Sequence, residues 1–128
     1  MKINKFFLVL SFLFFSLSLT GCGNNKVGET TPTDQNAEII FFYGQECPHC
    51  KSVEKYITDN NIEEKVNFIQ SEVYHNNDNA KLMVEKQKEC SLDEKMIGAV
   101  PFLWTQEKCF IGQDEIIQFF KGKINGGK

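Results

Sequence analysis

A short apolar run that ends at a glycine constrains the fold of this chain more than any other feature of its sequence. The residues Ile39–Tyr43 are Ile, Phe and Tyr only, and Gly44 follows them. A continuous run of β-branched and aromatic residues of this length predicts a strand that is buried on both faces. The rest of the chain must therefore supply elements that cover both faces of a sheet.

Periodicity and turn residues predict the elements that follow this strand. Val53, Tyr56 and Ile57 recur three and four residues apart among charged neighbours, as in an amphipathic helix, and Val66–Val73 is typical of a second strand. The later predictions are a second helix with Ala80, Met83, Val84, Gln87 and Cys90 on one face, a helical turn over 92–97, a hairpin of strands 102–104 and 109–111, and a last helix opened by Gly112. The order β-α-β-α-β-β-α predicts an α/β domain whose first two strands are parallel.

The first twenty-one residues have the pattern of an export signal. Lys2 and Lys5 precede the stretch Phe6–Leu19, which contains only Phe, Leu, Val and Ser. A basic start, an apolar core and small residues at the end are the three parts of a secretory signal, and the core is too short for a membrane span, which needs about 20 apolar residues. The residues Leu19–Cys22 resemble the lipobox of bacterial lipoproteins, in which the cysteine is lipidated and becomes the first mature residue.

This resemblance divides the chain into three parts. Residues 1–21 are predicted to be a lipoprotein signal peptide, 22–37 the lipidated N-terminus with a flexible tether, and 38–128 a folded domain. Residues 23–36 of the tether have Val27 as their single apolar side chain, so the segment cannot bury enough surface to fold. The alternatives are an ordinary cleaved signal or an uncleaved anchor, in which Cys22 is incidental. We expect an extracytoplasmic protein that is lipid-anchored to a bacterial membrane.

Charge and cysteine content exclude some functions. The chain has a net charge of -3, and it contains no arginine, so a nucleic-acid partner is not expected. If Cys22 carries lipid, four of the five cysteines remain, which suits pairing in an oxidising compartment. Spacing favours Cys47 with Cys50, and this leaves Cys90 with Cys109.

The motif Cys47–Cys50, with the sequence Cys-Pro-His-Cys, stands where the buried strand passes into the first helix. The first sulfur is therefore expected at the helix N-terminus, where unpaired amides and the helix dipole stabilise a thiolate. A thiolate is both the nucleophile and the leaving group of disulfide exchange. Pro48 suits the first helical turn because it has no amide proton. Cys50, one turn further, is placed to attack a mixed disulfide and release the product.

Two neighbours of Cys47 are expected to act on its thiolate in opposite directions. His49 offers a hydrogen-bond donor or a positive charge, which favours the thiolate, and hence the reduced enzyme and a more oxidising couple. Lys51 adds to this effect. The carboxylate of Glu46 disfavours the thiolate unless it points to solvent.

The strand, the Cys-Pro-His-Cys motif and the pair Val100-Pro101 before a hairpin resemble the thioredoxin superfamily from residue 38 to about residue 124. The dipeptide Pro48-His49 is similar to that of the DsbA-type disulfide oxidases, and the compact layout resembles glutaredoxins and small thioredoxin-like lipoproteins. The resemblance implies a three-layer thioredoxin-like fold, with a central four-stranded mixed sheet flanked by helices. It also implies that Pro101 is a cis-proline facing the cysteines and that the backbone of Val100 pairs with the substrate chain.

The chain departs from the pattern of this superfamily at two places. Phe41 occupies the position where thioredoxins and DsbA-type proteins commonly bury an acid, so proton transfer at Cys50 must use water or another group. Ile111–Asp114 stands where glutaredoxins have paired glycines that hold glutathione, so we expect no dependence on glutathione. The helical insertion of DsbA is also missing, and a broad peptide groove is not expected.

The spacing of the cysteines does not favour a metal site or a haem attachment site. A zinc site would need a second paired motif, which Cys90 and Cys109 do not form, and covalent haem would need a histidine where Lys51 stands. We therefore expect no metal and no cofactor. Cys90 and Cys109 are predicted to form a structural disulfide between the second helix and the hairpin, with a second redox pair as the alternative.

The resulting functional hypothesis is dithiol–disulfide exchange on exported proteins by a monomer. Cys47 attacks or is attacked, Cys50 resolves, His49 tunes the potential, and Val100 with Pro101 aligns the substrate. His49 favours an oxidase. A reductase fed by a membrane electron carrier is the main alternative, and a non-catalytic binding or chaperone module is another.

Overall fold

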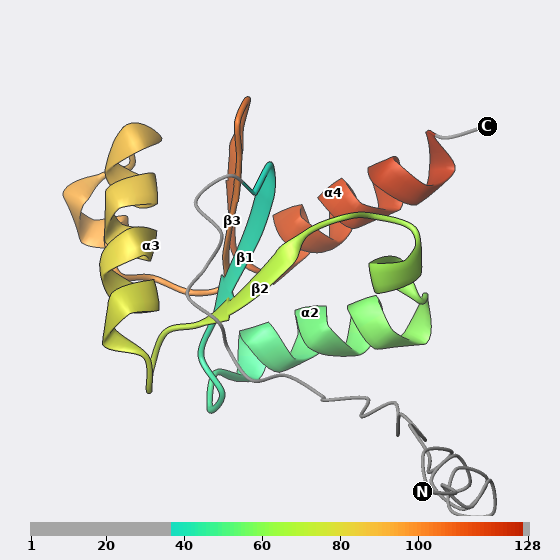
Figure 1. Cartoon of the computed structure of the whole chain (residues 1–128), viewed down its shortest axis with the longest axis horizontal. Helices are drawn as coiled ribbons and strands as arrows, with labels where there is room; N and C mark the ends of the chain where they lie inside the picture. The colour runs from blue at the N-terminus through green and yellow to red at the C-terminus, as the bar shows by residue number, and fades with distance from the viewer. Residues whose placement is uncertain (1–36, 127–128) are drawn as a thin grey trace, which may run out of the picture.

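Four strands form one mixed sheet in the computed structural model, which describes residues 37–126 (Figure 1). The strands are β1 (Ile39–Tyr43), β2 (Ile69–Glu72), β3 (Phe102–Thr105) and β4 (Cys109–Ile111). Their order across the sheet is β2-β1-β3-β4, with β1 parallel to β2 and antiparallel to β3, and β3 antiparallel to β4. The predicted parallel pairing of the first two strands is confirmed.

Three helices and two short 3₁₀ turns connect and cover the strands. They are α2 (Pro48–Asp59), η1 (Ile62–Glu64), α3 (Asn77–Glu89), η2 (Glu94–Met96) and α4 (Gln113–Asn125). The side chain of Asn76 caps α3 by accepting hydrogen bonds from the N–H groups of Asp78 and Asn79, both at 3.1 Å. Such caps satisfy amides that have no partner within the helix.

The central strand β1 is buried on both faces, as its sequence predicted. Ile39 and Phe41 pack in a core with side chains of α2 and α4, whereas Ile40 and Phe42 pack in a second core with Met83 of α3. Successive side chains of a strand point to opposite faces of the sheet, so a five-residue apolar run supplies both cores at once. Figure 1 shows the corresponding layers, with α2 and α4 on one side of the sheet and α3 on the other.

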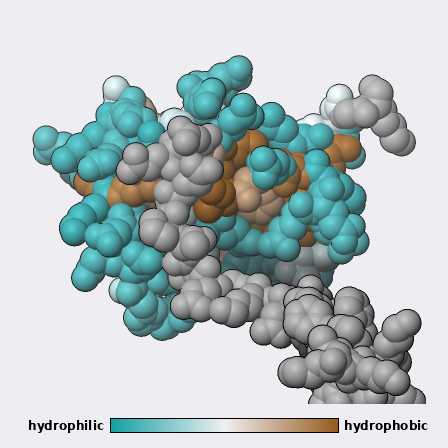
Figure 2. Space-filling view, viewed as in Figure 1, coloured by the Kyte–Doolittle hydropathy of each residue, from teal (hydrophilic) through white to brown (hydrophobic). Residues whose placement is uncertain are grey.

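The arrangement is the expected three-layer thioredoxin-like α/β fold. The element order β-α-β-α-β-β-α, the mixed four-stranded sheet and the helices on both faces are all confirmed. The face seen in Figure 2 is hydrophilic over most of its described surface, with apolar side chains gathered across the middle.

The second strand is shorter than predicted, because it begins at Ile69 and not at Val66. Asn61 has a left-handed φ of 49°, and the turn η1 follows it. The N–H of Val66 donates to the carbonyl of Ile62 at 2.8 Å, so this backbone belongs to the turn and cannot join the sheet. Val66 is nevertheless buried in the core. Its apolar character comes from packing outside the strand.

The predicted signal peptide 1–21, the lipidation site Cys22 and the tether up to residue 36 lie outside the described residues. Within residues 37–126, none of the helices has the length and apolar character needed to cross a bilayer.

Candidate active site

The cysteine motif lies at the junction of β1 and α2. Cys47 is the N-cap residue of α2 and Pro48 its first residue, and the N–H of Cys47 donates to the carbonyl of Gly44 at 3.1 Å. The N–H of Cys50 donates to the Cys47 sulfur at 3.2 Å. This sulfur therefore occupies the place of a capping oxygen, where it accepts a hydrogen bond from an amide that the helix leaves unpaired.

The two sulfurs differ in access and in acidity. Both cysteines are free thiols; Cys47 keeps 6% of its surface exposed and Cys50 keeps none. Burial, the hydrogen bond with Cys47 and the nearby charges on Cys47 and Glu54 raise the pKa of the Cys50 thiol to about 12. An incoming sulfur can therefore reach Cys47 first, while Cys50 stays protonated behind it.

The loop before β3 brings a backbone carbonyl to the Cys47 sulfur. The Val100-Pro101 peptide bond is cis, and the Cys47 thiol lies 3.9 Å from the Val100 carbonyl oxygen. The carbonyl of Pro101 accepts the N–H of Gly112 at 2.9 Å. The structure thus brings Val100 and Pro101 together with the cysteine pair, although they lie about fifty residues apart in sequence.

A buried glutamine on α3 braces this loop. Gln87 is completely buried; its amide nitrogen donates to the Ala99 carbonyl at 2.9 Å, and its amide oxygen accepts the Gly98 N–H at 2.7 Å. A buried amide with both ends paired fixes the backbone next to it. The sequence placed Gln87 on the inward face of its helix but gave no sign of this role.

His49 contacts the last helix. Its Nδ1 atom lies 2.9 Å from the amide oxygen of Gln113, in the first turn of α4, and the contact is exposed to solvent. Lys51, which was expected to assist His49, instead forms an ion pair with Glu54 at 3.0 Å.

A carboxylate at the end of β2 ties the loop before Cys47 to the turn after β2. Glu72 is buried and accepts the N–H groups of Tyr74 and His75, both at 2.8 Å, and that of Gln45 at 3.4 Å. His75 in turn forms an ion pair with Glu46 at 2.9 Å. This pairing raises the pKa of His75 and lowers the pKa of Glu46. The contacts of Glu72 with Gln45 and of His75 with Glu46 do not follow from sequence periodicity, because they join residues that are 27 and 29 positions apart.

Tyr74 covers the glycine at the start of the active-site loop. A Cβ atom at Gly44 would overlap the Tyr74 ring, so the ring can lie there only because residue 44 has no side chain. Burial first, and then the charges on Cys47 and Cys50, raise the pKa of the Tyr74 hydroxyl. Tyr74 is half exposed, so it forms part of the surface around the cysteines.

Cys90 and Cys109 form a disulfide. Cys90 is the C-cap residue of α3 and Cys109 opens β4. The bond therefore joins the second helix to the hairpin, on the opposite side of the sheet from α2 and α4.

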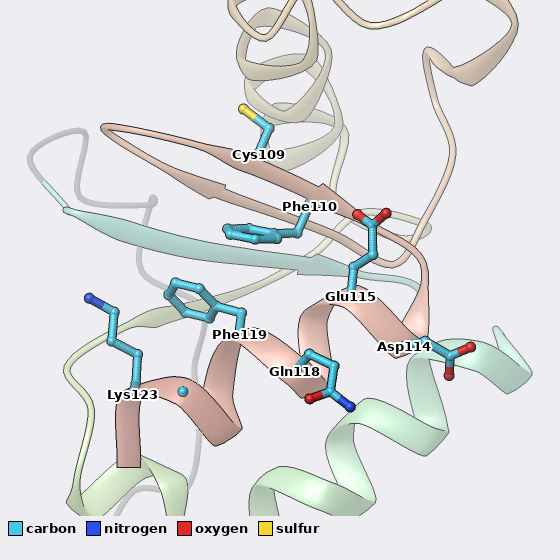
Figure 3. A pocket seen from close by; sticks show the side chains of 8 residues that line it. Cys109, Phe110, Asp114, Glu115, Gln118, Phe119 and Lys123 are labelled. Carbon is cyan, nitrogen blue, oxygen red and sulfur yellow. The ribbon is translucent and has the colours of Figure 1, made fainter. Parts of the chain in front are cut away.

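Several grooves border the last helix. One of about 790 Å³ is formed by β4 and α4; in Figure 3 the rings of Phe110 and Phe119 lie along it. It does not include the cysteine motif. A groove of about 530 Å³ does adjoin the motif, and it is lined by His49, Val100, Pro101, Ile111, Gly112, Gln113, Asp114 and Glu115. Among residues 37–126 no three metal-binding side chains are clustered.

No protein-family model and no curated protein matches this chain. Two solved structures are similar in fold. Wheat glutaredoxin is 22% identical with a TM-score of 0.47, and the match covers 68% of this chain and 72% of that one. The glutaredoxin from Archaeoglobus fulgidus is 21% identical with a TM-score of 0.48, covering 72% of this chain and 90% of that one. The fold assignment itself rests on the strand order and the layers.

Proposed function

We propose that this chain is a lipid-anchored, extracytoplasmic thiol–disulfide oxidoreductase that exchanges dithiols and disulfides in exported proteins through Cys47 and Cys50, and that it acts as an oxidase. The observation that carries the proposal is the position of the Cys47 sulfur. It caps α2, it accepts the Cys50 N–H at 3.2 Å, and it is the more exposed of the two sulfurs. A sulfur in that position is stabilised as an anion, which suits a nucleophile and a leaving group.

The exchange reaction consists of two successive displacements at sulfur. In the oxidase direction, a substrate thiolate attacks the Cys47 sulfur of a Cys47–Cys50 disulfide, that bond breaks, and Cys50 leaves with the electron pair. The second thiolate of the substrate then attacks the substrate sulfur that is bonded to Cys47, and Cys47 leaves with the electron pair. The substrate dithiol is oxidised to a disulfide, and the enzyme pair is reduced to the dithiol. A membrane redox partner would reoxidise the pair.

The groove beside His49 supports a polypeptide substrate. The Val100 carbonyl borders both this groove and the Cys47 sulfur, so an extended chain lying there can meet backbone groups next to the reacting atom. Apart from His49, the titratable side chains that line the groove are the acids Asp114 and Glu115. An anionic small thiol such as glutathione would meet repulsion there, which agrees with the expectation of no glutathione dependence.

Trapping tests the proposal. In cells, Cys50→Ala should accumulate mixed disulfides between Cys47 and exported proteins, visible as reducible high-mass bands, because the intermediate can no longer be resolved. The matched control is the double variant Cys47→Ala/Cys50→Ala, which keeps the fold but has no attacking sulfur. The absence of trapped species with Cys50→Ala would favour a binding or chaperone module.

Two further measurements test the direction of the exchange and the lipid anchor. A reduction potential for the Cys47–Cys50 pair well below that of glutathione would favour a reductase fed by a membrane electron carrier over an oxidase. Metabolic labelling with a fatty acid should be lost on Cys22→Ala, and label that survives this change would contradict lipidation at that residue.

A further inference from the structure

The buried second cysteine has to lose a proton before it can react. Cys50 has no exposed surface, and burial together with its hydrogen bond to Cys47 raises the pKa of its thiol to about 12. At neutral pH only about one such thiol in 10⁵ is ionised, so attack by a pre-formed thiolate would be slow. A nearby group that accepts the proton during the attack would remove this limit.

Glu54 offers a carboxylate on the same face of α2. It follows Cys50 by four residues, and a helical side chain leans towards the helix N-terminus, over the turn that contains Cys50. The Glu54 charge is one of the causes that raise the pKa of the Cys50 thiol, so the two groups interact electrostatically.

One oxygen of Glu54 is buried without a hydrogen bond. Within the described part of the chain, Oε2 of Glu54 is the buried side-chain oxygen or nitrogen for which no hydrogen-bond partner is found. The Lys51 ammonium lies 3.0 Å from this atom, as an ion pair whose orientation gives no hydrogen bond. Because this oxygen accepts no hydrogen bond, it has lone pairs that can accept a proton.

Five other titratable side chains near the cysteines are poor proton acceptors. The pKa values of Tyr43 and Tyr74 are raised above 10.0, mainly by burial, so both hydroxyls stay protonated at neutral pH. The carboxylate of Glu72 already accepts three backbone N–H groups. Glu46 is exposed and paired with His75. The ion pair with Glu54 raises the pKa of Lys51, which stays a cation.

We infer that Glu54 accepts the proton of the Cys50 thiol, directly or through one water molecule, when Cys50 resolves a mixed disulfide. This inference rests on the proposed exchange function. In the step, the Cys50 sulfur attacks the Cys47 sulfur, the Cys47–substrate bond breaks, and the substrate sulfur leaves with the electron pair. The proton moves from Cys50 to Glu54 and then to solvent. In the reverse direction, protonated Glu54 returns a proton to Cys50 as it leaves.

Stopped-flow kinetics with a chromogenic aryl disulfide tests this step. The full-length chain carries Cys22→Ala, so that only the reduced Cys47–Cys50 pair reacts. The first aryl thiolate is released when Cys47 attacks, and the second when Cys50 resolves the mixed disulfide. Glu54→Gln should leave the first phase unchanged and slow the second at least about 100-fold near pH 7, the lower end of the typical contribution of a general base.

The pH profile distinguishes proton transfer from a structural effect. If Glu54 accepts the proton, the second phase should change little with pH around neutrality. In Glu54→Gln the rate should follow the thiolate fraction of Cys50 and rise about tenfold per pH unit. If Glu54→Gln fails to fold, Glu54→Asp keeps a shorter carboxylate and should give a slower second phase with the wild-type pH profile.

Two controls separate the carboxylate from the ion pair. Asp59→Asn removes the exposed Lys55–Asp59 pair of the same helix and should change neither phase. Lys51→Gln breaks the Glu54 pair but keeps the carboxylate, so its second phase should keep the wild-type pH profile. A Lys51→Gln profile as steep as that of Glu54→Gln would overturn the inference.

The outcomes also separate this inference from the proposed function. If the wild-type chain releases no aryl thiolate, the exchange function fails. If both phases are present and Glu54→Gln matches the wild type at every pH, the exchange function stands and the role of Glu54 is refuted.

Discussion

The Nδ1 atom of His49 lies 2.9 Å from the amide oxygen of Gln113, so the residue between the two cysteines is tied to a helix that begins 64 residues further along the chain. Because the amide oxygen can only accept, Nδ1 carries the proton in this contact. The hydrogen bond restricts the orientation of the ring. The helix-to-helix contact therefore controls where His49 can offer a donor or a charge.

Removing His49 should make the Cys47–Cys50 couple more reducing. A donor or positive charge at this position favours the thiolate of the reduced pair, and its loss favours the disulfide. For His49→Ala we expect the potential to fall by on the order of 30 mV, which corresponds to about 1.4 kcal/mol for a two-electron couple. Equilibration with a thiol redox buffer, followed by alkylation and mass analysis, measures it.

Gln113→Leu is the matched variant for the orientation of the ring, because it keeps His49 and removes its partner. Its potential should fall less than that of His49→Ala. If His49→Ala leaves the potential unchanged, the ring does not stabilise the thiolate and the argument for an oxidase loses its basis.

The buried thiol of Cys50 should make the reduced protein lose stability at alkaline pH. In the unfolded chain this thiol titrates near 9.0, whereas in the folded chain burial raises its pKa to about 12. Between these values the folded state keeps a proton that the unfolded state has lost. The free energy of unfolding therefore holds its full value below pH 9 and falls as pH rises through the window, by up to about 1.4 kcal/mol per pH unit.

Urea unfolding of the reduced protein at several pH values measures this loss. Cys50→Ala has no such thiol and should lack the extra decrease, and so should the oxidised wild type, in which the sulfur cannot titrate. An equal alkaline decrease in Cys50→Ala would contradict a raised pKa at Cys50. Other groups that titrate in this range are common to both proteins and cancel in the comparison.

The elements that the sequence predicts well are those that local physics determines. The run Ile39–Tyr43 is apolar or aromatic at every position because both faces of β1 are buried. Such a run can be recognised from the sequence alone. The N-cap position of Cys47 likewise follows from a strand, a proline and an amphipathic helix in sequence. The predicted start of β2 at Val66 was wrong, because Val66 belongs to a turn and packs in the core from there. Apolar spacing alone does not distinguish a strand from a buried turn.

The polar contacts around the cysteines could not be predicted, because they join segments that only the fold brings together. Glu72 accepts the N–H of Gln45, 27 residues earlier. Asn79 is buried on α3 and donates to the Glu72 carbonyl at 2.9 Å. The spacing of four residues between Cys50 and Glu54, in contrast, can be read from the sequence.

The disulfide Cys90–Cys109 should contribute to stability without taking part in exchange. It closes a loop with a sequence separation of 19, and a bridge of this span stabilises a small domain by about 2 to 4 kcal/mol. The double variant Cys90→Ala/Cys109→Ala should unfold at a lower urea concentration, with its free energy of unfolding reduced by about 2 to 4 kcal/mol. It should retain the exchange rate of Cys47. If stability is kept and turnover with a redox partner is lost, the two cysteines form a second redox pair.

The ion pair between Glu46 and His75 should titrate as a unit beside Cys47. The hydrogen bond with Glu46 raises the pKa of His75 above 6.5, and the same contact lowers the pKa of Glu46 below 4.5. The stabilisation that His75 contributes is thus complete below pH 6.5 and is lost as the pH rises through its raised pKa. The stabilisation that Glu46 contributes is complete above pH 4.5 and is lost as the pH falls through its lowered pKa. Both charges coexist between these limits.

Glu46→Gln should lower the pKa of His75 back towards 6.5, which an NMR titration of the imidazole signals measures, with His49→Gln used to assign the two rings. Glu107→Gln, on the distant hairpin, removes a comparable surface charge and should leave the His75 titration in place. Because the pair neutralises a carboxylate next to Cys47, His75→Gln should slow alkylation of Cys47 near pH 6, where the imidazolium of the wild type is present. A His75 titration that is the same with and without the Glu46 carboxylate would show that the contact does not form in solution.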